Sequence, residues 1–328
     1  MIQIIAEIGS VHDGSFGNAL KLIEAASIAG ADAVKFQTHI AEAESIASAP
    51  TPSYFSNESR IAYFKRTSFT LEQWSCLASH ALDNGVTFLS SPFSLEAVEL
   101  LEEIGIAAYK IPSGEVSNIP LLTRIASTGK PVLLSSGMSS WDELDLAVGT
   151  VKDACPTTVM QCTSAYPCPP EKVGLNVLRE MQQRYLLPIG FSDHTLGMSA
   201  PIAAAALGAT VIEKHFTFSR QMYGSDALHS MEPSEFKLMV AALREVWSML
   251  DNPILKSDVE PYAEMKRIFE KSIVAVRTIC PGEKITIEML AFKKPGDGIP
   301  ARDYKRLLGR IAKREIMPDQ KITEDDLN

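Results

Sequence analysis

The order of strand-like and helical segments constrains this chain more than any single motif does. Short runs rich in β-branched residues predict strands at Ile2–Ile8, Ala33–Thr38, Thr87–Ser91, Ala107–Pro112, Pro131–Ser135, Thr157–Thr163, Pro188–Ser192 and Thr210–Phe216. Helical patterns lie at Asn18–Ala29, Leu71–Asn84, Leu95–Ile104, Trp141–Asp153, Leu175–Tyr185, Ala200–Leu207 and Ser234–Leu250. Eight strand–helix units in series predict a parallel sheet, and eight is the number that closes a TIM (β/α)8 barrel of about 250 residues.

A doubly wound open sheet is the competing α/β fold. It would place a glycine-rich phosphate loop after the first strand. Gly9, Gly14 and Gly17 follow that strand without the G-x-G-x-x-G spacing, so the barrel is favoured. Several helical patterns end at a glycine, which suits a left-handed helix cap; these glycines are Gly30, Gly85, Gly105, Gly129 and Gly208.

The sequence pattern changes after residue 250, where prolines separate short strand-like segments such as Ser272–Ile279. We therefore expect three parts: a barrel over residues 1–250, a linker over 251–270, and a small β-rich domain over 271–328.

Charge and cysteine usage narrow the function classes. The 328 residues include 31 Lys and Arg against 40 Asp and Glu, a net charge of −9, which disfavours a nucleic-acid partner. The first residues lack the basic region of a signal peptide, and the most apolar stretch, Ala200–Ile212, is too short for a membrane span. Five cysteines without a C-x-x-C pair suggest reduced thiols. A cytoplasmic protein is the expectation.

Polar residues end nearly every predicted strand, where a barrel of this type builds its active site. Lys35 and Lys110 stand within apolar runs, and a buried ammonium group needs an anionic partner. Glu7, Glu213 and Asp193 are the available carboxylates, so purely structural ion pairs are the alternative interpretation.

These polar residues permit two kinds of chemistry. The lysines form a donor-rich set suited to a phosphate and a carboxylate, together with the hydroxyls of Ser91, Ser135, Ser164 and Ser192. His194 and His215 end adjacent strands and are candidates for one divalent cation, for which imidazole ligands suit Mn²⁺, Fe²⁺, Co²⁺ or Zn²⁺.

The motifs, taken in order, resemble one family along the whole chain. They are Ala6-Glu7-Ile8-Gly9 with His12-Asp13-Gly14, Ala33-Val34-Lys35-Phe36-Gln37-Thr38-His39, Ser90-Ser91-Pro92-Phe93-Ser94, Tyr109-Lys110-Ile111 with Ser113-Gly114-Glu115, Leu134-Ser135-Ser136-Gly137-Met138, Gln161-Cys162-Thr163-Ser164-Ala165-Tyr166-Pro167, Gly190-Phe191-Ser192-Asp193-His194-Thr195, Glu213-Lys214-His215-Phe216, Gly224-Ser225-Asp226 and Phe292-Lys293-Lys294-Pro295-Gly296-Asp297-Gly298. The chain is similar to the sialic acid synthase (N-acetylneuraminate synthase) family, and its last motif resembles an antifreeze-like (SAF) domain.

The resemblance implies a TIM barrel joined to a SAF domain, in a domain-swapped homodimer. It implies condensation of phosphoenolpyruvate with an open-chain N-acylated hexosamine to a nine-carbon 2-keto-3-deoxy sugar acid. Phosphoenolpyruvate would bind Lys35, Ser91, Lys110, Ser135, Ser164 and Ser192. Glu7, Tyr166, Asp226 and Lys294 would contact the acceptor, and Glu7, Glu213 and Gln37 would serve catalysis. His194 and His215 would hold a divalent metal, Mn²⁺ with Mg²⁺ or Co²⁺ as alternatives.

Several points stay open at the level of sequence. The expected acceptor is N-acetylmannosamine, with a di-N-acetylated dideoxy hexose of the legionaminic or pseudaminic type as the alternative. Lys294 stands where many bacterial members have an arginine. We expect His229 to lie on a surface loop, with contact to the substrate as the alternative. A Schiff-base aldolase using Lys110 or Lys214, and a non-catalytic carbohydrate-binding barrel, are the rival functions.

Overall fold

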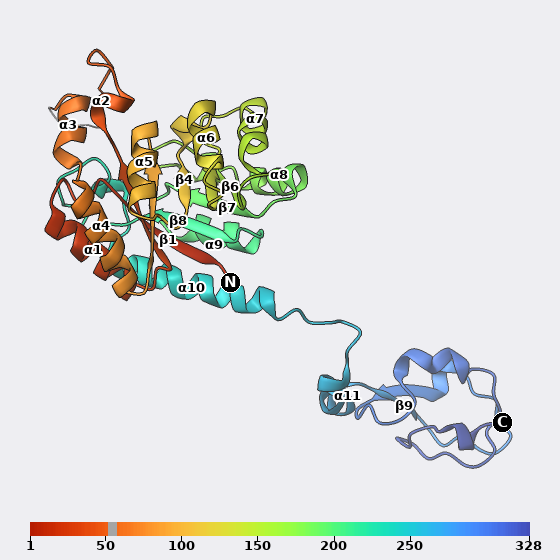
Figure 1. Cartoon of the computed structure of the whole chain (residues 1–328). Helices are drawn as coiled ribbons and strands as arrows, with labels where there is room; N and C mark the ends of the chain where they lie inside the picture. The colour runs from red at the N-terminus through yellow and green to blue at the C-terminus, as the bar shows by residue number, and fades with distance from the viewer. Residues whose placement is uncertain (52–57) are drawn as a thin grey trace. The chain divides into compact units, whose positions relative to one another are not determined.

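The structure is a computed structural model that describes residues 1–51 and 58–328. The chain divides into two compact units, Met1–Asn252 and Pro253–Asn328, and each is described by itself (Figure 1).

Eight parallel strands close the first unit into a barrel in which sequence neighbours are also spatial neighbours. The strands are β1 (Gln3–Gly9), β2 (Ala33–Thr38), β3 (Thr87–Pro92), β4 (Tyr109–Ile111), β5 (Val132–Ser135), β6 (Thr157–Cys162), β7 (Ile189–Asp193) and β8 (Val211–His215). Closure comes from β1 pairing with β8, where Glu7 lies opposite His215. The predicted TIM barrel is confirmed, and each predicted strand is present to within about two residues at either end.

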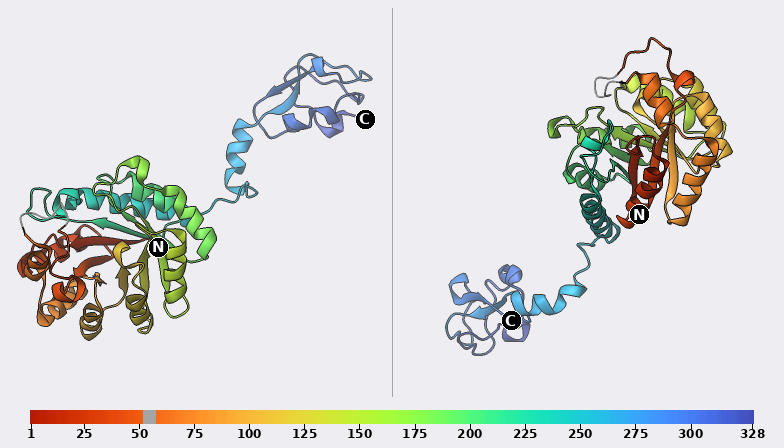
Figure 2. Two further views of the ribbon diagram at one scale, coloured as in Figure 1. Left: turned by 90° about the horizontal axis from the view of Figure 1, so that it is seen from above. Right: turned by 90° about the vertical axis from the view of Figure 1, so that its left-hand side faces the viewer.

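Helices surround this barrel, as Figure 2 shows from two further directions. They are α1 (Phe16–Ile28), α2 (Ala41–Glu44), α3 (Arg60–Thr67), α4 (Leu71–Asp83), α5 (Leu95–Glu103), α6 (Ile119–Ala126), α7 (Trp141–Val151), α8 (Leu175–Tyr185), α9 (Ser199–Ala206) and α10 (Pro233–Asp251). Side-chain oxygens of Ser15, Thr70, Ser94 and Ser140 cap the first turns of α1, α4, α5 and α7. Gly30, Gly85, Gly105, Gly129 and Gly208 all have positive φ, as expected for left-handed caps.

In the described part of the barrel unit, three short helices have no counterpart in the sequence prediction: α2, α3 and α6. Two of them, α2 and α3, lie in the long connection between β2 and β3, which the pattern of apolar residues leaves undefined. None of the helices in the described ranges is both long and apolar enough to cross a membrane.

The second unit has its own apolar core, which includes Ile273, Ile279, Ile285, Ile316 and Ile322. Strands β9 (Ser272–Ala275) and β10 (Leu290–Lys293) form a two-stranded antiparallel sheet within it. The segment expected to be a linker is partly helical, because α11 (Ala263–Phe269) forms there. Ion pairs at helical spacing support this turn, between Arg267 and Glu264 and between Lys266 and Glu270.

Candidate active site

A cavity of about 490 Å³ opens where the barrel strands end. Side chains from all eight strands, or from the residues directly after them, line it; those predicted from the sequence are Glu7, Lys35, Gln37, Ser91, Lys110, Ser135, Ser164, Tyr166, Ser192, His194, Glu213, His215 and Asp226. The parallel barrel brings these residues together because it gathers the carboxyl ends of its strands at one end.

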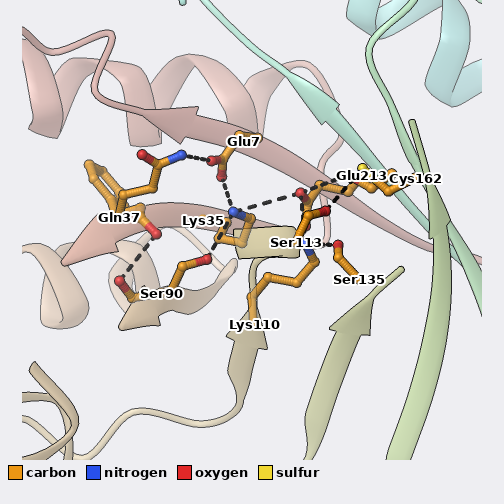
Figure 3. Close-up of polar contacts among 12 residues, drawn as sticks. Glu7, Lys35, Gln37, Ser90, Lys110, Ser113, Ser135, Cys162 and Glu213 are labelled. Atoms are coloured by element: carbon orange, nitrogen blue, oxygen red, sulfur yellow. Dashed lines mark hydrogen bonds and ion pairs between the residues drawn. The ribbon is translucent and has the colours of Figure 1, made fainter. Parts of the chain in front are cut away.

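Two buried lysines and two buried glutamates form the charged floor of this cavity (Figure 3). The Lys35 ammonium lies 2.8 Å from Glu7 Oε2 and 3.6 Å from Glu213 Oε1. The Lys110 ammonium lies 3.4 Å from the same Glu213 oxygen. None of the four side chains is more than 6% exposed, so each charge depends on its neighbours rather than on water.

The pKa values of the two glutamates shift in opposite directions. Burial by itself would raise the pKa of Glu213, but the ammonium groups of Lys110 and Lys35 outweigh burial and lower this pKa to about 2. Burial raises the pKa of Glu7 above its ordinary value, and Lys35 offsets only part of that rise. Burial alone would lower the pKa of Lys35, but Glu213 and Glu7 raise it, so Lys35 stays an ammonium group. Glu213 is therefore ionised at neutral pH, whereas the raised pKa of Glu7 suits a carboxyl that exchanges a proton.

Hydroxyl groups surround the two ammonium groups. Lys35 donates to Ser91 Oγ at 3.3 Å, and Lys110 donates to Ser135 Oγ at 2.6 Å. Ser192 Oγ donates to Glu213 Oε1 at 3.1 Å. Two cations with several hydroxyl donors in one enclosed space can hold a small molecule that carries a phosphate and a carboxylate.

Gly137 marks a close approach at the edge of this donor set. A Cβ atom at this position would lie 2.4 Å from Ser113 Oγ and 2.5 Å from Ser164 Oγ. The glycine therefore lets the hydroxyls from the ends of β4 and β6 approach the turn after β5.

The two predicted metal ligands lie side by side, with ring centroids 5.4 Å apart. His194 Nδ1 donates to the carbonyl oxygen of Thr163 at 2.8 Å, which leaves Nε2 with its lone pair. His215 Nδ1 is buried without a hydrogen-bond partner in the described part of the chain. Two adjacent imidazoles fit a divalent cation that keeps open positions for other ligands. Residues 1–51 and 58–328 contain no cluster of three or more His, Cys, Asp or Glu side chains able to hold such an ion.

The residues expected to contact the acceptor fall into two groups. Tyr166 lies at the cavity with its ring centroid 4.1 Å from that of His194, and Asp226 Oδ2 accepts a hydrogen bond from the Ser10 backbone at 3.3 Å. Lys294 belongs to the second unit, where its ammonium lies 5.0 Å from the Phe269 ring centroid.

Two expectations about single residues are wrong. His229 does not lie on an outer surface loop but lines the cavity, because the short turn Ala227–His229 follows Asp226 there. Asp193 is not a partner of Lys35 or Lys110. It points away from the cavity and pairs with the buried Lys214 at 2.5 Å, since both residues lie one position out of step with the inward-facing Ser192 and Glu213.

Sequence reasoning did not identify one wall of the cavity. Arg60, Tyr63 and Phe64 of α3 line it, together with Phe93 and Ser113. The Ser113 hydroxyl stood next to a predicted strand end and was a detectable signal. The α3 residues carried none, because nothing in their pattern shows that the helix folds back over the barrel mouth.

Comparisons with known proteins show the family to which this chain belongs. The NeuB family matches residues 22–254 and the SAF domain matches residues 270–328. An N,N'-diacetyllegionaminic acid synthase of Campylobacter jejuni is 37% identical, over 98% of each chain. The N-acetylneuraminate-9-phosphate synthase of Mus musculus is 34% identical, over 99% of this chain and 92% of that one. The crystal structure of the N-acetylneuraminic acid synthetase of Leptospira borgpetersenii is 31% identical, with a TM-score of 0.74 over 81% of this chain and 90% of that one.

Proposed function

Since this chain belongs to the NeuB family of nonulosonic acid synthases, we propose that it joins phosphoenolpyruvate to an N-acylated open-chain sugar. The products are a nine-carbon 2-keto-3-deoxy sugar acid and inorganic phosphate. The observation that carries the proposal is the pair of buried lysines from β2 and β4, surrounded by hydroxyls, in the cavity that also holds two adjacent histidines.

The chain's own residues position the phosphoenolpyruvate. Lys35 and Lys110 balance the charge of its phosphate and carboxylate, and hydroxyls donate to the same oxygens; these come from Ser91, Ser135, Ser164 and Ser192. So held, C3 of the enol attacks the aldehyde carbon. Water then adds to the positive centre formed at C2, and phosphate leaves by cleavage of its bond to C2.

Glu7 is the carboxyl that we assign to proton transfer or to orienting the water. Its raised pKa and its place on the cavity wall suit a group that gains and loses a proton. Glu213 instead stays ionised between the two lysines, which lower its pKa. Gln37 Nε2 donates to Glu7 Oε1 at 2.9 Å, so Gln37 orients this carboxyl.

His194 and His215 would hold a divalent metal, for which Mn²⁺ is the first candidate and Mg²⁺ or Co²⁺ the next. When bound, such an ion supplies Lewis-acid polarisation of a carbonyl oxygen. The chain itself orients the His194 imidazole, through the hydrogen bond from His194 Nδ1 to the Thr163 carbonyl.

The acceptor that we place first is a di-N-acetylated dideoxy hexose, ahead of N-acetylmannosamine. The C. jejuni relative named for N,N'-diacetyllegionaminic acid supports this order, because it is more similar to this chain than the relative named for N-acetylneuraminate 9-phosphate. Tyr166 and Asp226 would contact this sugar from the barrel, and Lys294 would contact it from the SAF domain of a partner subunit in a swapped dimer.

Phosphate release tests the proposal. The full chain, incubated with phosphoenolpyruvate, Mn²⁺ and a panel of acceptor sugars, should release inorganic phosphate with at least one acceptor and yield a product of matching mass. EDTA, His194→Ala and His215→Ala should each abolish release while the fold is retained. Absence of release with every acceptor would overturn the synthase assignment, and full turnover in both histidine variants would overturn the metal site.

The Schiff-base alternative gains little from the geometry. Lys214 does not line the cavity, and the Lys110 amine is already engaged, 3.4 Å from Glu213 Oε1 and 2.6 Å from Ser135 Oγ. Borohydride treatment with pyruvate should therefore leave the protein unlabelled. A covalent adduct on Lys110 would instead support the aldolase hypothesis.

A further inference from the structure

A chain of buried hydrogen bonds leads from the β2–β3 connection to the Glu7 carboxyl. Glu44 Oε2 lies 2.8 Å from His39 Nδ1, and His39 Nε2 lies 3.2 Å from Gln37 Oε1. Gln37 Nε2 donates to Glu7 Oε1 at 2.9 Å. His39 is 8% exposed and the Glu44 side chain 4%, so solvent has little access to the bond between them.

The chemistry of the groups fixes the direction of these bonds. An ionised Glu7 only accepts, so the NH2 end of the Gln37 amide must face it, and the amide oxygen must face His39. His39 Nε2 must then carry a proton. One further proton lies between His39 Nδ1 and Glu44 Oε2, on the ring or on the carboxyl. In both cases Nε2 remains a donor. Glu44 therefore fixes the donor and the acceptor of each hydrogen bond from His39 to Glu7.

Two aromatic rings hold the imidazole in the orientation that this chain requires. The centroids of Phe64 and Phe93 lie 3.8 Å and 4.1 Å from that of His39, with interplanar angles of 15° and 19°. A ring stacked in this way has both nitrogens at its edge, where they reach Glu44 and Gln37. The stack joins α3 to the residue after β3, so the inserted helix takes part in setting the ring.

We propose that Glu44 and His39 are positioning residues that hold the Gln37 amide with its NH2 group toward Glu7. The inference rests on the proposed function, because it is the Glu7 carboxyl whose orientation these residues serve. Without the His39 donor, the Gln37 amide can rotate and present its oxygen to Glu7. The two oxygens repel each other, so the Glu7 carboxyl would move out of the position that catalysis requires.

Matched substitutions at His39 separate donation from packing. His39→Phe keeps an aromatic ring between Phe64 and Phe93 but removes the donor, whereas His39→Gln keeps an NH2 group near the position of Nε2. We expect His39→Phe to lower kcat about 10- to 100-fold, with the KM for phosphoenolpyruvate changed less than about twofold. His39→Gln should restore most of kcat. Wild-type kcat in His39→Phe, or no rescue by His39→Gln, would overturn the proposal.

A double-mutant cycle tests whether His39 acts through Gln37. Once Gln37→Leu has removed the amide, adding His39→Phe should lower kcat no further, whereas an independent structural effect would multiply the two losses. Multiplied losses would therefore overturn the proposal.

Glu44 provides a second pair of variants if His39→Phe does not fold. The amide of Glu44→Gln can donate to His39 Nδ1 and keep the proton on Nε2, so kcat should stay within about threefold of wild type. Glu44→Leu cannot fix the proton and should behave as His39→Phe does. Equal kcat values for the two Glu44 variants would overturn the role of Glu44.

A spectroscopic measurement separates this inference from the proposed function. The ¹⁵N side-chain amide signal of Gln37, assigned by its loss in Gln37→Leu, should move in His39→Phe and return in His39→Gln, whether or not the protein turns over. If wild type releases no phosphate, the proposed function fails and the amide signal alone decides the inference. An unchanged signal in His39→Phe would refute the positioning role.

Discussion

Glu213 lies between two buried ammonium groups and is the anion on which both depend. The hydroxyl of Ser192 also donates to it. Removing one member of a buried ion network costs more than removing a surface pair, since the remaining charges lose their compensation. Burial makes the two lysines suitable for binding phosphate. For the same reason, the stability of the fold depends on the Glu213 carboxylate.

We predict that Glu213→Gln lowers the free energy of unfolding at pH 7 by about 3 kcal/mol, without phosphoenolpyruvate. The pKa of this carboxyl falls from 4.5 to about 2 on folding, so its contribution is complete above pH 4.5 and is lost as the pH falls toward 2. Urea denaturation at pH 7 and pH 3 should show the difference between wild type and variant shrinking at the lower pH.

Glu99→Gln is the matched control, because it removes a glutamate that is 61% exposed and paired with Arg124. Its effect on the free energy of unfolding should be much smaller than that of Glu213→Gln at both pH values, because solvent screens an exposed ion pair. A Glu213→Gln variant as stable as wild type at pH 7 would contradict the role given to this carboxylate.

At the scale of single residues, the sequence predicts where a charged side chain lies better than it predicts which residue pairs with it. The strand ends locate Lys35, Lys110 and Glu213, because a parallel barrel gathers strand ends whatever the side chains are. Which carboxylate pairs with which lysine depends on the alternation of inward and outward residues. A shift of one position in β7 and β8 sends Asp193 and Lys214 out of the cavity while Ser192 and Glu213 stay in it.

At the scale of elements, helices α2 and α3 supply what the apolar pattern did not reveal. The strands are predictable because a buried parallel strand is a continuous apolar run. Helix α2 has four residues and helix α3 has eight, and segments this short do not show the periodicity of apolar residues that identifies a helix. Helix α3 nevertheless brings Arg60, Tyr63 and Phe64 to the cavity.

Arg60 is the charged residue that α3 adds to the cavity wall. Its guanidinium lies 5.6 Å from the Phe64 ring centroid, and its Nε is buried with no hydrogen-bond partner among residues 1–51 and 58–328. An unsatisfied donor at a cavity wall is available to an oxygen of the bound sugar.

We predict that Arg60→Ala raises the KM of the acceptor sugar about tenfold or more and leaves that of phosphoenolpyruvate unchanged. Initial rates with each substrate varied in turn measure both constants. Arg66→Ala, on the same helix, is the control: Arg66 pairs with Glu58 and Asp13 and does not line the cavity. Equal effects of the two substitutions would contradict a contact between Arg60 and the acceptor.

At the scale of the whole molecule, the proposed swapped dimer assigns the SAF domain of each subunit to the pocket of its partner. The second unit has an apolar core of its own, and it carries Lys294 next to Phe269. Lysine gives this position a cation without the planar fork of arginine. In a swapped homodimer, Lys294 of each subunit would complete the partner's pocket, so the barrel and the tail of one active site would come from different chains.

Complementation between two impaired chains tests this arrangement. Glu7→Gln damages the pocket and Lys294→Ala damages the tail, so in a swapped mixed dimer one of the two sites has an intact pocket and an intact tail. At acceptor concentrations below KM, we predict that each variant alone is nearly inactive and that co-expressed subunits recover about a quarter of wild-type activity. Glu7→Gln mixed with the Glu7→Gln/Lys294→Ala double variant controls for any effect of mixing and should stay inactive. If each tail instead serves its own barrel, every site in the mixed dimer keeps one lesion, and the absence of recovery would exclude the exchange.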